Sequence, residues 1–329
     1  MGAHSNILRS MKTIARGITY TDLMFLGTPR IIATAALHSP AGVALVDPGP
    51  STCLPTLRAA LGEQGIAIAD VRTILLTHIH LDHAGATGSL VAENPKIQVY
   101  VHEHGAPHMA DPTKLLISAG RLYGDDMDRL WGQFLPVPRE NLHILSGGER
   151  IKAADRELDV AYTPGHAWHH VSFFDPSSGV AFVGDAAGVR IGPDLFAMPP
   201  TPPPDIDIET WKASAALLEH WGAETLFITH FGPHGDPTAH LASLVEHLDG
   251  IAALARGIVE RDVSDAKRVD LFVANISQYL QRNMSDTVAA LYGQACPFWQ
   301  CWQGLARYWK KKGVGTSVKK EGVNRQEPR

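Results

Sequence analysis

The segment THIHLDHAG, residues 77–85, places four metal-ligating side chains within six positions. It follows an apolar run that is typical of a buried strand and precedes a helical pattern, so we expect a tight loop at the edge of a sheet. A zinc ion takes about four N or O ligands at roughly 2.0–2.2 Å. The loop can therefore offer His78 and His80 to one ion, and Asp82 and His83 to a neighbouring ion.

Three further ligand-type residues each follow a predicted strand. His166 ends the run YTPGH, Asp185 ends FVGD, and His230 ends FITH. A single residue of this kind is weak evidence, because a histidine at a strand end is more often structural. Together with the loop, however, these strand ends bring five histidines and two aspartates to one rim, which is enough for two ions.

The predicted strands fall into two blocks, and each block is followed by helices. This order fits an α+β fold in which two sheets pack face to face with helices outside both, a four-layer αββα sandwich. Ser51 is expected to cap a helix that runs to about residue 61. The expected strands lie at about 18–37, 42–46, 71–76, 97–101, 142–145, 157–162, 171–174, 180–183 and 225–228.

Helical patterns interrupt and then extend this sandwich. We expect two inserted helices within residues 105–142 and a helical C-terminal extension over residues 251–311. The sandwich domain would then span residues 1–250, and residues 312–329 would form a disordered basic tail. In the extension, an apolar stripe that includes Trp302 and Trp309 is expected to pack against the body.

Composition places the 329-residue chain among ordinary globular proteins, with 45% hydrophobic and 19% charged residues. The net charge of −5 is uneven: residues 310–329 hold seven basic and two acidic residues, a net +5, which leaves −10 for residues 1–309. An acidic body argues against a nucleic-acid partner. No apolar run reaches the length of a membrane span, so we expect no membrane partner.

Cysteine usage bears on the compartment. The chain has three cysteines and no Cys-x-x-Cys pair, which argues against a disulfide framework, and its first residues lack the apolar stretch of a secretory signal. We therefore expect a cytoplasmic protein. Its partner would be a small-molecule substrate, and a homodimer stays open.

The motifs THIHLDHAG, TPGH, VGDA and ITH, in this order, resemble those of the metallo-β-lactamase-fold hydrolase superfamily. The resemblance extends over about residues 18–248 and implies the metallo-β-lactamase sandwich. The segments GHAWHHVSF and VGDAAG look like those of a bacterial and archaeal branch of the family, similar to glyoxalase II and the lactonases. The basic glutathione-binding motif of glyoxalase II is not visible in the C-terminal helical region.

The resemblance implies two Zn²⁺ ions per chain, although the same ligands accept iron or manganese. Asp185 would bridge the two ions. Asp47 and His170 would position the metal ligands without binding an ion themselves. Asp82 would be a catalytic residue as well as a ligand. The implied ligands are His78, His80 and His166 for the first ion, and Asp82, His83 and His230 for the second.

The implied activity is hydrolysis of an ester, thioester or lactone by a hydroxide held between the two ions. His80 stands where redox members of the fold have glutamate, and no flavin-binding partner domain follows it, which favours zinc and hydrolysis. A mononuclear-iron sulfur (persulfide) dioxygenase is the main alternative. A phosphodiesterase or nuclease is a further one, and a metal-stabilised binding protein without turnover is the last.

Substrate contacts are expected from the loops at the metal-bearing rim. The insertion at 105–142 carries Tyr123 and Trp131, and the proline-rich run after Asp185 is preceded by Phe196. We predict that these three aromatic side chains line the substrate pocket, with hydrophobic packing of a lid as the alternative.

Overall fold

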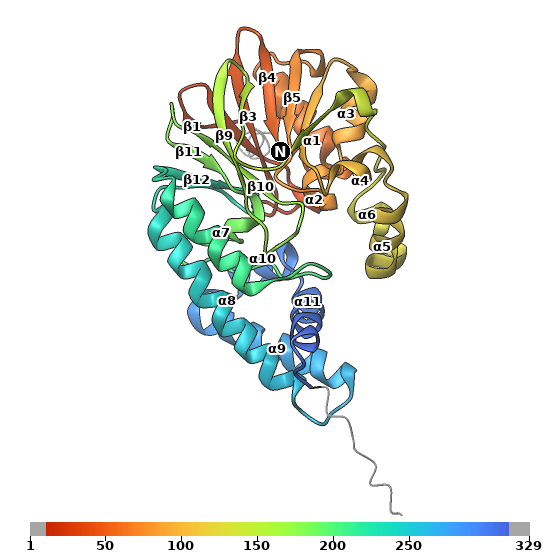
Figure 1. Cartoon of the computed structure of the whole chain (residues 1–329), viewed down its shortest axis with the longest axis vertical. Helices are drawn as coiled ribbons and strands as arrows, with labels where there is room; N and C mark the ends of the chain where they lie inside the picture. Colours follow the sequence, from red (N-terminus) through yellow and green to blue (C-terminus); the bar gives the residue numbers. More distant parts are fainter. Residues whose placement is uncertain (1–10, 316–329) are drawn as a thin grey trace, which may run out of the picture.

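The computed structural model describes residues 11–315 and contains two mixed sheets with helices around them (Figure 1). The first sheet has seven strands in chain order. Strands β1 to β4 form an antiparallel meander, and β4 to β7 run parallel. These strands are β1 (Lys12–Ala15), β2 (Ile18–Asp22), β3 (Ala33–Ser39), β4 (Gly42–Val46), β5 (Val71–Leu75), β6 (Gln98–His102) and β7 (Leu142–Leu145).

The second sheet has six strands in the order β13-β12-β11-β10-β9-β8. All its neighbours are antiparallel except β11 and β12. Three strands had no counterpart in the sequence prediction, namely β1, β8 and β13, and each lies at the edge of its sheet. The strands of this sheet are β8 (Arg150–Ala153), β9 (Arg156–Tyr162), β10 (Val171–Asp175), β11 (Val180–Phe182), β12 (Thr225–Ile228) and β13 (Gly232–His234).

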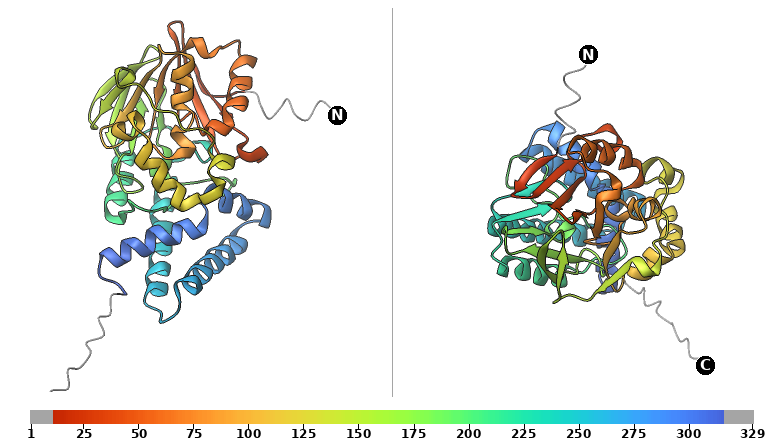
Figure 2. Two further views of the ribbon diagram at one scale, coloured as in Figure 1. Left: turned by 90° about the vertical axis from the view of Figure 1, so that its right-hand side faces the viewer. Right: turned by 90° about the horizontal axis from the view of Figure 1, so that it is seen from above.

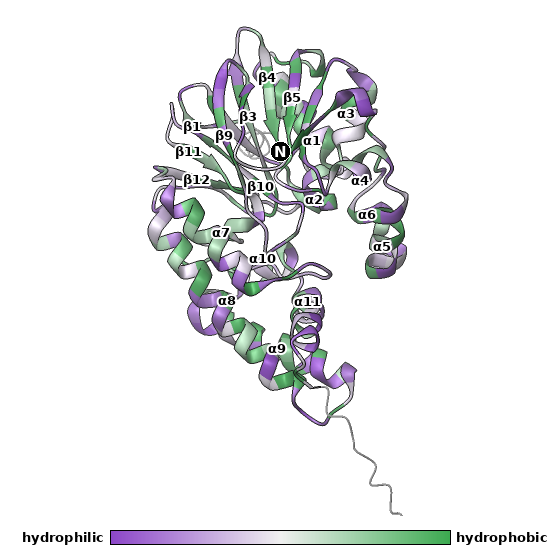
Figure 3. Cartoon of the chain, viewed as in Figure 1, coloured by the Kyte–Doolittle hydropathy of each residue, from purple (hydrophilic) through white to green (hydrophobic). Residues whose placement is uncertain are grey.

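The four predicted layers are confirmed by the way each strand divides its side chains. In β4, Val43 and Leu45 face the core under the outer helices, whereas Ala44 and Val46 face the core between the sheets. Side chains alternate along a strand, so a strand covered on both faces is apolar throughout. Figure 3 shows β4 as mainly hydrophobic, and the helices with both hydrophobic and hydrophilic residues.

Helices cover the outer face of each sheet. The first sheet is covered by α1 (Leu54–Glu63), α2 (Leu81–Ala84) and α3 (Thr87–Glu93), and the second by α7 (Ile208–His220) and α8 (Pro237–Val259). Ser51 does not cap α1, which corrects the sequence prediction. Its hydroxyl instead donates to the carbonyls of Gly85 at 3.0 Å and Gln133 at 2.5 Å, so it joins the metal-binding loop to the insertion.

The insertion contains three α-helices where two were expected. They are α4 (Ala106–Ala110), α5 (Thr113–Tyr123) and α6 (Met127–Leu130), which stand to one side of the sandwich in Figure 1. Pro112 begins α5 and Gly124 ends it at a positive φ of 54°, so the backbone itself divides the segment.

The C-terminal helices form a further layer below the sandwich, as Figure 2 shows. They are α9 (Asp265–Asn283), α10 (Asp286–Ala295) and α11 (Phe298–Lys311). The expected boundary at residue 250 falls inside α8, whose first half packs on the second sheet and whose second half packs on α9 and α11. One continuous helix therefore joins the extension to the sandwich. Residues 316–329 of the expected basic tail lie outside the described residues.

The strand ends that matter for function meet at one rim. Strands β4 and β5 are parallel in the first sheet. In the second sheet β9, β11 and β12 share a direction, because β10 is antiparallel to both β9 and β11 and β11 is parallel to β12. The loops after these five strands carry every ligand-type residue predicted from the sequence. Within residues 11–315 no helix combines the length and hydrophobicity needed to cross a bilayer.

Candidate metal centre

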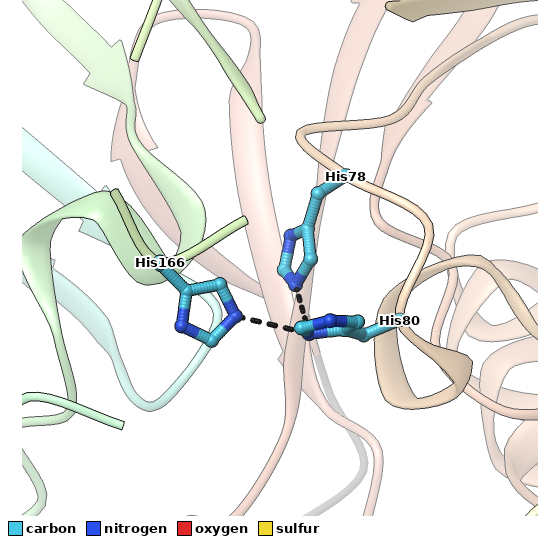
Figure 4. A group of neighbouring side chains, drawn as sticks. All are labelled: His78, His80 and His166. Carbon is cyan, nitrogen blue, oxygen red and sulfur yellow. Dashed lines mark hydrogen bonds between the residues drawn. The ribbon is translucent and has the colours of Figure 1, made fainter. Parts of the chain in front are cut away.

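Three histidines form the first group of converging ligand atoms (Figure 4). The loop after β5 supplies His78 and His80, and the turn after β9 supplies His166. The Nδ1 atom of His80 lies 3.0 Å from Nε2 of His78 and 2.9 Å from Nε2 of His166. Three imidazole nitrogens that face one point can all direct lone pairs at the same cation.

Asp82, His83 and His230 form the second group. The loop and the short helix α2 supply the first two residues, and the end of β12 supplies His230. Oδ2 of Asp82 lies 3.3 Å from Nε2 of His230 and 3.8 Å from Nε2 of His83. The two groups use different residues, so each offers its own set of three ligands.

Asp185 lies between the two groups. Its Oδ2 atom is 3.4 Å from His166 in the first group, and its Oδ1 atom is 3.3 Å from His83 and 3.6 Å from His230 in the second. One carboxylate thus turns one oxygen to each group. This is the arrangement that a ligand shared by two ions requires.

Unpaired polar atoms test whether these residues fit a metal. Among the buried atoms of the described residues, Nε2 of His83 and Oδ1 of Asp185 have no hydrogen-bond partner. A buried polar atom without a partner costs about 1–3 kcal/mol. Both atoms face the second group, so an ion bound there would satisfy both. The donor set of imidazole nitrogens and carboxylate oxygens fits zinc, iron or manganese.

The remaining ring nitrogens of the ligands are held in place by oxygen atoms. Nδ1 of His166 donates to the carbonyl of Pro200 at 2.8 Å, and Nδ1 of His230 donates to the carbonyl of Ile31 at 2.6 Å. Each bond uses Nδ1 and leaves Nε2 turned toward the centre. Such outer partners fix the ring and raise its basicity as a ligand.

Asp47 is the most heavily bonded of these outer partners. It is fully buried, and its Oδ2 atom accepts from Nδ1 of His83 at 2.9 Å and from the hydroxyls of Thr77 at 2.7 Å and Thr229 at 2.9 Å. Its Oδ1 atom accepts from the backbone N–H of Thr77 at 2.8 Å. The loops after β4, β5 and β12 are therefore tied together by one carboxylate.

His170 lies behind the first group without joining it. Its Nδ1 atom is 2.9 Å from the Thr163 hydroxyl, and its Nε2 atom accepts from the backbone N–H of Ala186 at 3.3 Å. Its ring stacks on His78 with centroids 5.0 Å apart. Both nitrogens are engaged elsewhere, so His170 can position His78 but is not free to bind an ion.

The electrostatics of the site follow from burial and from close charges. Burial lowers the pKa of His83, but the carboxylates of Asp185 and Asp82 outweigh it and hold that pKa well above its ordinary value. Burial and the neighbouring histidines keep the pKa of His78 well below its ordinary value. The surroundings of His83 therefore favour positive charge, whereas those of His78 favour a neutral imidazole.

A cavity of about 650 Å³ opens onto both groups. Its walls come from residues 25–32, the insertion, the proline-rich run and the start of α11. Tyr123 and Trp131, two of the predicted substrate contacts, line this cavity, and their rings meet edge to face with centroids 5.1 Å apart. Most of the other lining side chains are apolar, including Phe25, Ile31, Ile32, Leu81, Leu115, Leu122, Leu130 and Trp299.

Phe196 was predicted to line the substrate pocket together with Tyr123 and Trp131. In the structure it is not among the residues that line this cavity. Its ring packs against His247 at 4.2 Å and Tyr292 at 5.4 Å between centroids, inside the core of the C-terminal helices. The proline-rich run that follows does reach the cavity, through Pro200 and Pro202. The chain between these points turns Phe196 away from the metal-bearing rim.

The wall formed by residues 294–301 was missed by the sequence reasoning. Trp299 and Gln300 line the cavity from the first turn of α11, and Gln300 hydrogen-bonds Tyr123 from the insertion. The signal available in the sequence was the run CPFWQC at the start of an amphipathic helix. Its apolar stripe indicated packing against the body, but periodicity alone does not say what the helix end meets.

Comparison with known families bears on the same region of the chain. The model of the metallo-beta-lactamase superfamily matches residues 27–230, more than half of the chain and all seven ligand-type residues. The chain belongs to the metallo-β-lactamase superfamily. This confirms the resemblance carried by the four motifs.

Curated relatives of this superfamily member match only part of it. A hydroxyacylglutathione hydrolase of Legionella pneumophila (strain Lens) is 29% identical over 43% of this chain and 41% of its own length. Another from Synechocystis is 32% identical over 47% of this chain and 45% of its own length. The chain thus spans less than half the length of these two relatives.

Solved structures extend the likeness to most of this superfamily member. The archaeal metallo-β-lactamase superfamily protein ST1585 from Sulfolobus tokodaii has a TM-score of 0.60 at 20% identity, and the match covers 84% of this chain and 93% of that one. The family protein TTHA1429 from Thermus thermophilus has a TM-score of 0.62 at 23% identity, over 86% and 89%. At these identities the likeness shows the fold alone.

Proposed function

We propose that this chain is a hydrolase that uses two divalent metal ions, zinc in the first instance, to cleave an ester, thioester or lactone with an apolar acyl group. The observation that supports it most is the pair of three-residue ligand groups joined by Asp185 at the floor of an apolar cavity. When bound, such a pair of ions supplies a nucleophilic water at neutral pH and polarises the scissile carbonyl.

The protein's own contribution begins with excluding water and holding the acyl group. Trp131 is 8% exposed and stacks on Phe25 with centroids 5.6 Å apart. We assign its ring as an apolar wall for the acyl group, since it lines the cavity.

Tyr123 provides a polar group in the same wall. Burial raises the pKa of its hydroxyl, and the charge of Asp82 adds to the effect, so the group stays protonated at neutral pH. The hydroxyl can thus donate a hydrogen bond to a substrate oxygen and hold that oxygen beside the second ligand group.

The charges around the cavity narrow the substrate class. Lys114 is the one Lys or Arg among the lining residues of the described chain, while Asp126 and Asp205 add negative charge. Glutathione carries carboxylates, which such a wall does not favour. We therefore propose that an uncharged, apolar acyl compound is cleaved in preference to the glutathione thioesters named for the relatives.

The ligand groups also weigh against the alternatives. An iron dioxygenase of this fold needs two histidines and one aspartate, whereas here a second complete group with its own unpaired atoms stands beside the first. A nuclease needs cationic side chains along a phosphate backbone, and the cavity has a single lysine.

The test uses zinc-loaded protein with 4-nitrophenyl esters, acyl thioesters and lactones of increasing acyl length. Each methylene buried in the cavity should raise kcat/KM about 4-fold, from about 0.8 kcal/mol per CH₂. Trp131→Ala should flatten this dependence while metal content stays the same. Trp221→Ala is the matched control, because Trp221 stacks on Phe174 at 5.5 Å outside the cavity.

Three other results would each contradict one part of the proposal. One iron per chain and oxygen uptake with a persulfide would replace the hydrolase by the dioxygenase. Cleavage of phosphodiesters alone would favour the nuclease. Equal effects of Trp131→Ala and Trp221→Ala would remove Trp131 from the binding site.

A further inference from the structure

Two cysteines lie together in the cavity wall opposite the metal centre. Cys296 follows α10 and Cys301 lies in the first turns of α11. Their sulfur atoms are 3.1 Å apart, both residues line the cavity, and they are only 2% and 1% exposed. Nothing in the proposed hydrolysis uses this pair.

The start of α11 explains why the two sulfurs meet. Pro297 is the N-cap, so Cys296 precedes the cap and Cys301 is the fourth helical residue. These two positions contact each other at many helix starts, where apolar side chains form a staple. The carbonyl of Pro297 accepts from the backbone N–H of Gln300 at 2.9 Å and of Cys301 at 3.2 Å, which fixes this turn. Here the staple consists of two thiols.

The pair differs from the third cysteine of the chain. The hydrogen bond from Cys296 holds the pKa of the Cys301 thiol below its ordinary value, and a thiol of this kind is the more reactive one. Burial raises the pKa of Cys53 to about 12, and Cys53 does not line the cavity. Cys301 thus combines a lowered thiol pKa with a place in the cavity wall.

We propose that Cys296 and Cys301 are a modification site, a dithiol that closes to an intramolecular disulfide when a hydroperoxide enters the cavity. The Cys301 thiolate attacks the peroxide oxygen, forms a sulfenic acid and releases an alcohol or water after proton uptake. Cys296 then attacks the sulfenic sulfur, the S–O bond breaks, and its thiol proton leaves with the hydroxyl as water. Two electrons pass from the thiols to the peroxide.

The disulfide needs only a small movement. Its sulfur atoms must approach from 3.1 Å to about 2.05 Å, a shift of roughly 1 Å at the joint between α10 and α11. The carbonyl of Cys301 accepts from the Thr201 hydroxyl at 3.2 Å, and the neighbouring Pro200 carbonyl accepts from the ligand His166 at 2.8 Å. Formation of the disulfide should therefore shift the segment Pro200–Thr201, whose Pro200 carbonyl orients His166.

The test of the disulfide itself does not depend on the proposed hydrolase. The full chain is treated with hydrogen peroxide, alkylated in denaturant and digested for mass spectrometry. We expect a peptide cross-linked between Cys296 and Cys301 that has lost two hydrogen atoms, with Cys53 alkylated, and full reversal by dithiothreitol. The parent protein gives this result without any variant, so folding of a variant does not limit the test.

Variants assign the cross-link to its residues. Cys53→Ala, the control, should keep the cross-link, and Cys301→Ala should abolish it. Three alkylated thiols after peroxide, a cross-link through Cys53 or between chains, or oxidation that ends at a sulfinic acid would each overturn the proposal. A change in ester hydrolysis on oxidation that dithiothreitol reverses would link the site to activity, and that link rests on the proposed function.

Discussion

Replacing Asp47 by asparagine should weaken one metal site much more than the other. Within residues 11–315 the backbone N–H of Thr77 has no other acceptor, so the amide oxygen of the new side chain should keep the position of Oδ1. The amide NH₂ then takes the place of Oδ2 and faces Nδ1 of His83. Two donors meet there, unless His83 moves its proton to Nε2, the nitrogen that faces Asp185 and would bind the ion.

The magnitude follows from the bond that is lost. A hydrogen bond to a charged group contributes about 1.5–3 kcal/mol, which corresponds to about a 10–100-fold loss of affinity. This is also the usual cost of changing an outer partner of a metal ligand. The loss should fall on the group of Asp82, His83 and His230, because the first group has no direct bond to Asp47.

The assay is zinc competition against a chromophoric chelator, fitted with two sites. The matched control is Asp175→Asn. Asp175 is equally buried and bonded to Arg156, Ser177 and Ser178, but it lies away from the rim. The control should lose stability toward urea and keep both zinc affinities. Equal weakening of both sites in the Asp47 variant, or the same zinc loss in the control, would refute the reasoning.

Three further predictions test other parts of the structure. Asp185→Ala should release both ions and abolish activity, whereas His230→Ala should keep about one ion per chain. Elemental analysis of both variants measures this. Two ions retained in Asp185→Ala would contradict the role of Asp185 as a bridging ligand. Burial raises the pKa of Asp175, but its hydrogen bonds outweigh this and hold the pKa below the ordinary value, so the carboxylate stabilises the fold above about pH 4 and loses this effect as the pH falls. Urea midpoints should therefore fall less between about pH 5 and pH 3 in Asp175→Asn than in the parent. Gly165 has a φ of 126°, and a Cβ there would lie 2.3 Å from the backbone of α7, so Gly165→Ala should lower stability strongly. In the control Gly222→Ala the new Cβ meets no atom within 4 Å, and the positive φ alone should cost about 1 kcal/mol. Equal urea midpoints of the two variants would show that α7 moves aside.

The residues of the two converging groups could be proposed as ligands from the sequence because each one closely follows an apolar strand. A loop of nine residues that carries His78 and His83 is local information, and parallel strands bring their ends together without further instruction. The outer strands of the sheets were harder. Strands such as β8 and β13 have few residues and one free side, so their pattern is weak, and Pro233 in β13 argues against a strand.

Contacts between distant segments could not be predicted in the same way. Ser51 has the residue type of a helix cap, but two carbonyls from elsewhere in the chain bind its hydroxyl. Phe196 lies close in sequence to a loop at the rim, yet the C-terminal helices offer its ring a better-packed environment. Both errors arise because tertiary contacts outweigh a local preference.

The cavity has two walls of different origin. The metal-bearing floor and the insertion lie within residues 27–230, the region shared with the superfamily, whereas Gln294, Trp299 and Cys301 belong to chain beyond it. Substitutions in this C-terminal stretch would therefore change the lining of the cavity and leave the residues of both ligand groups in place.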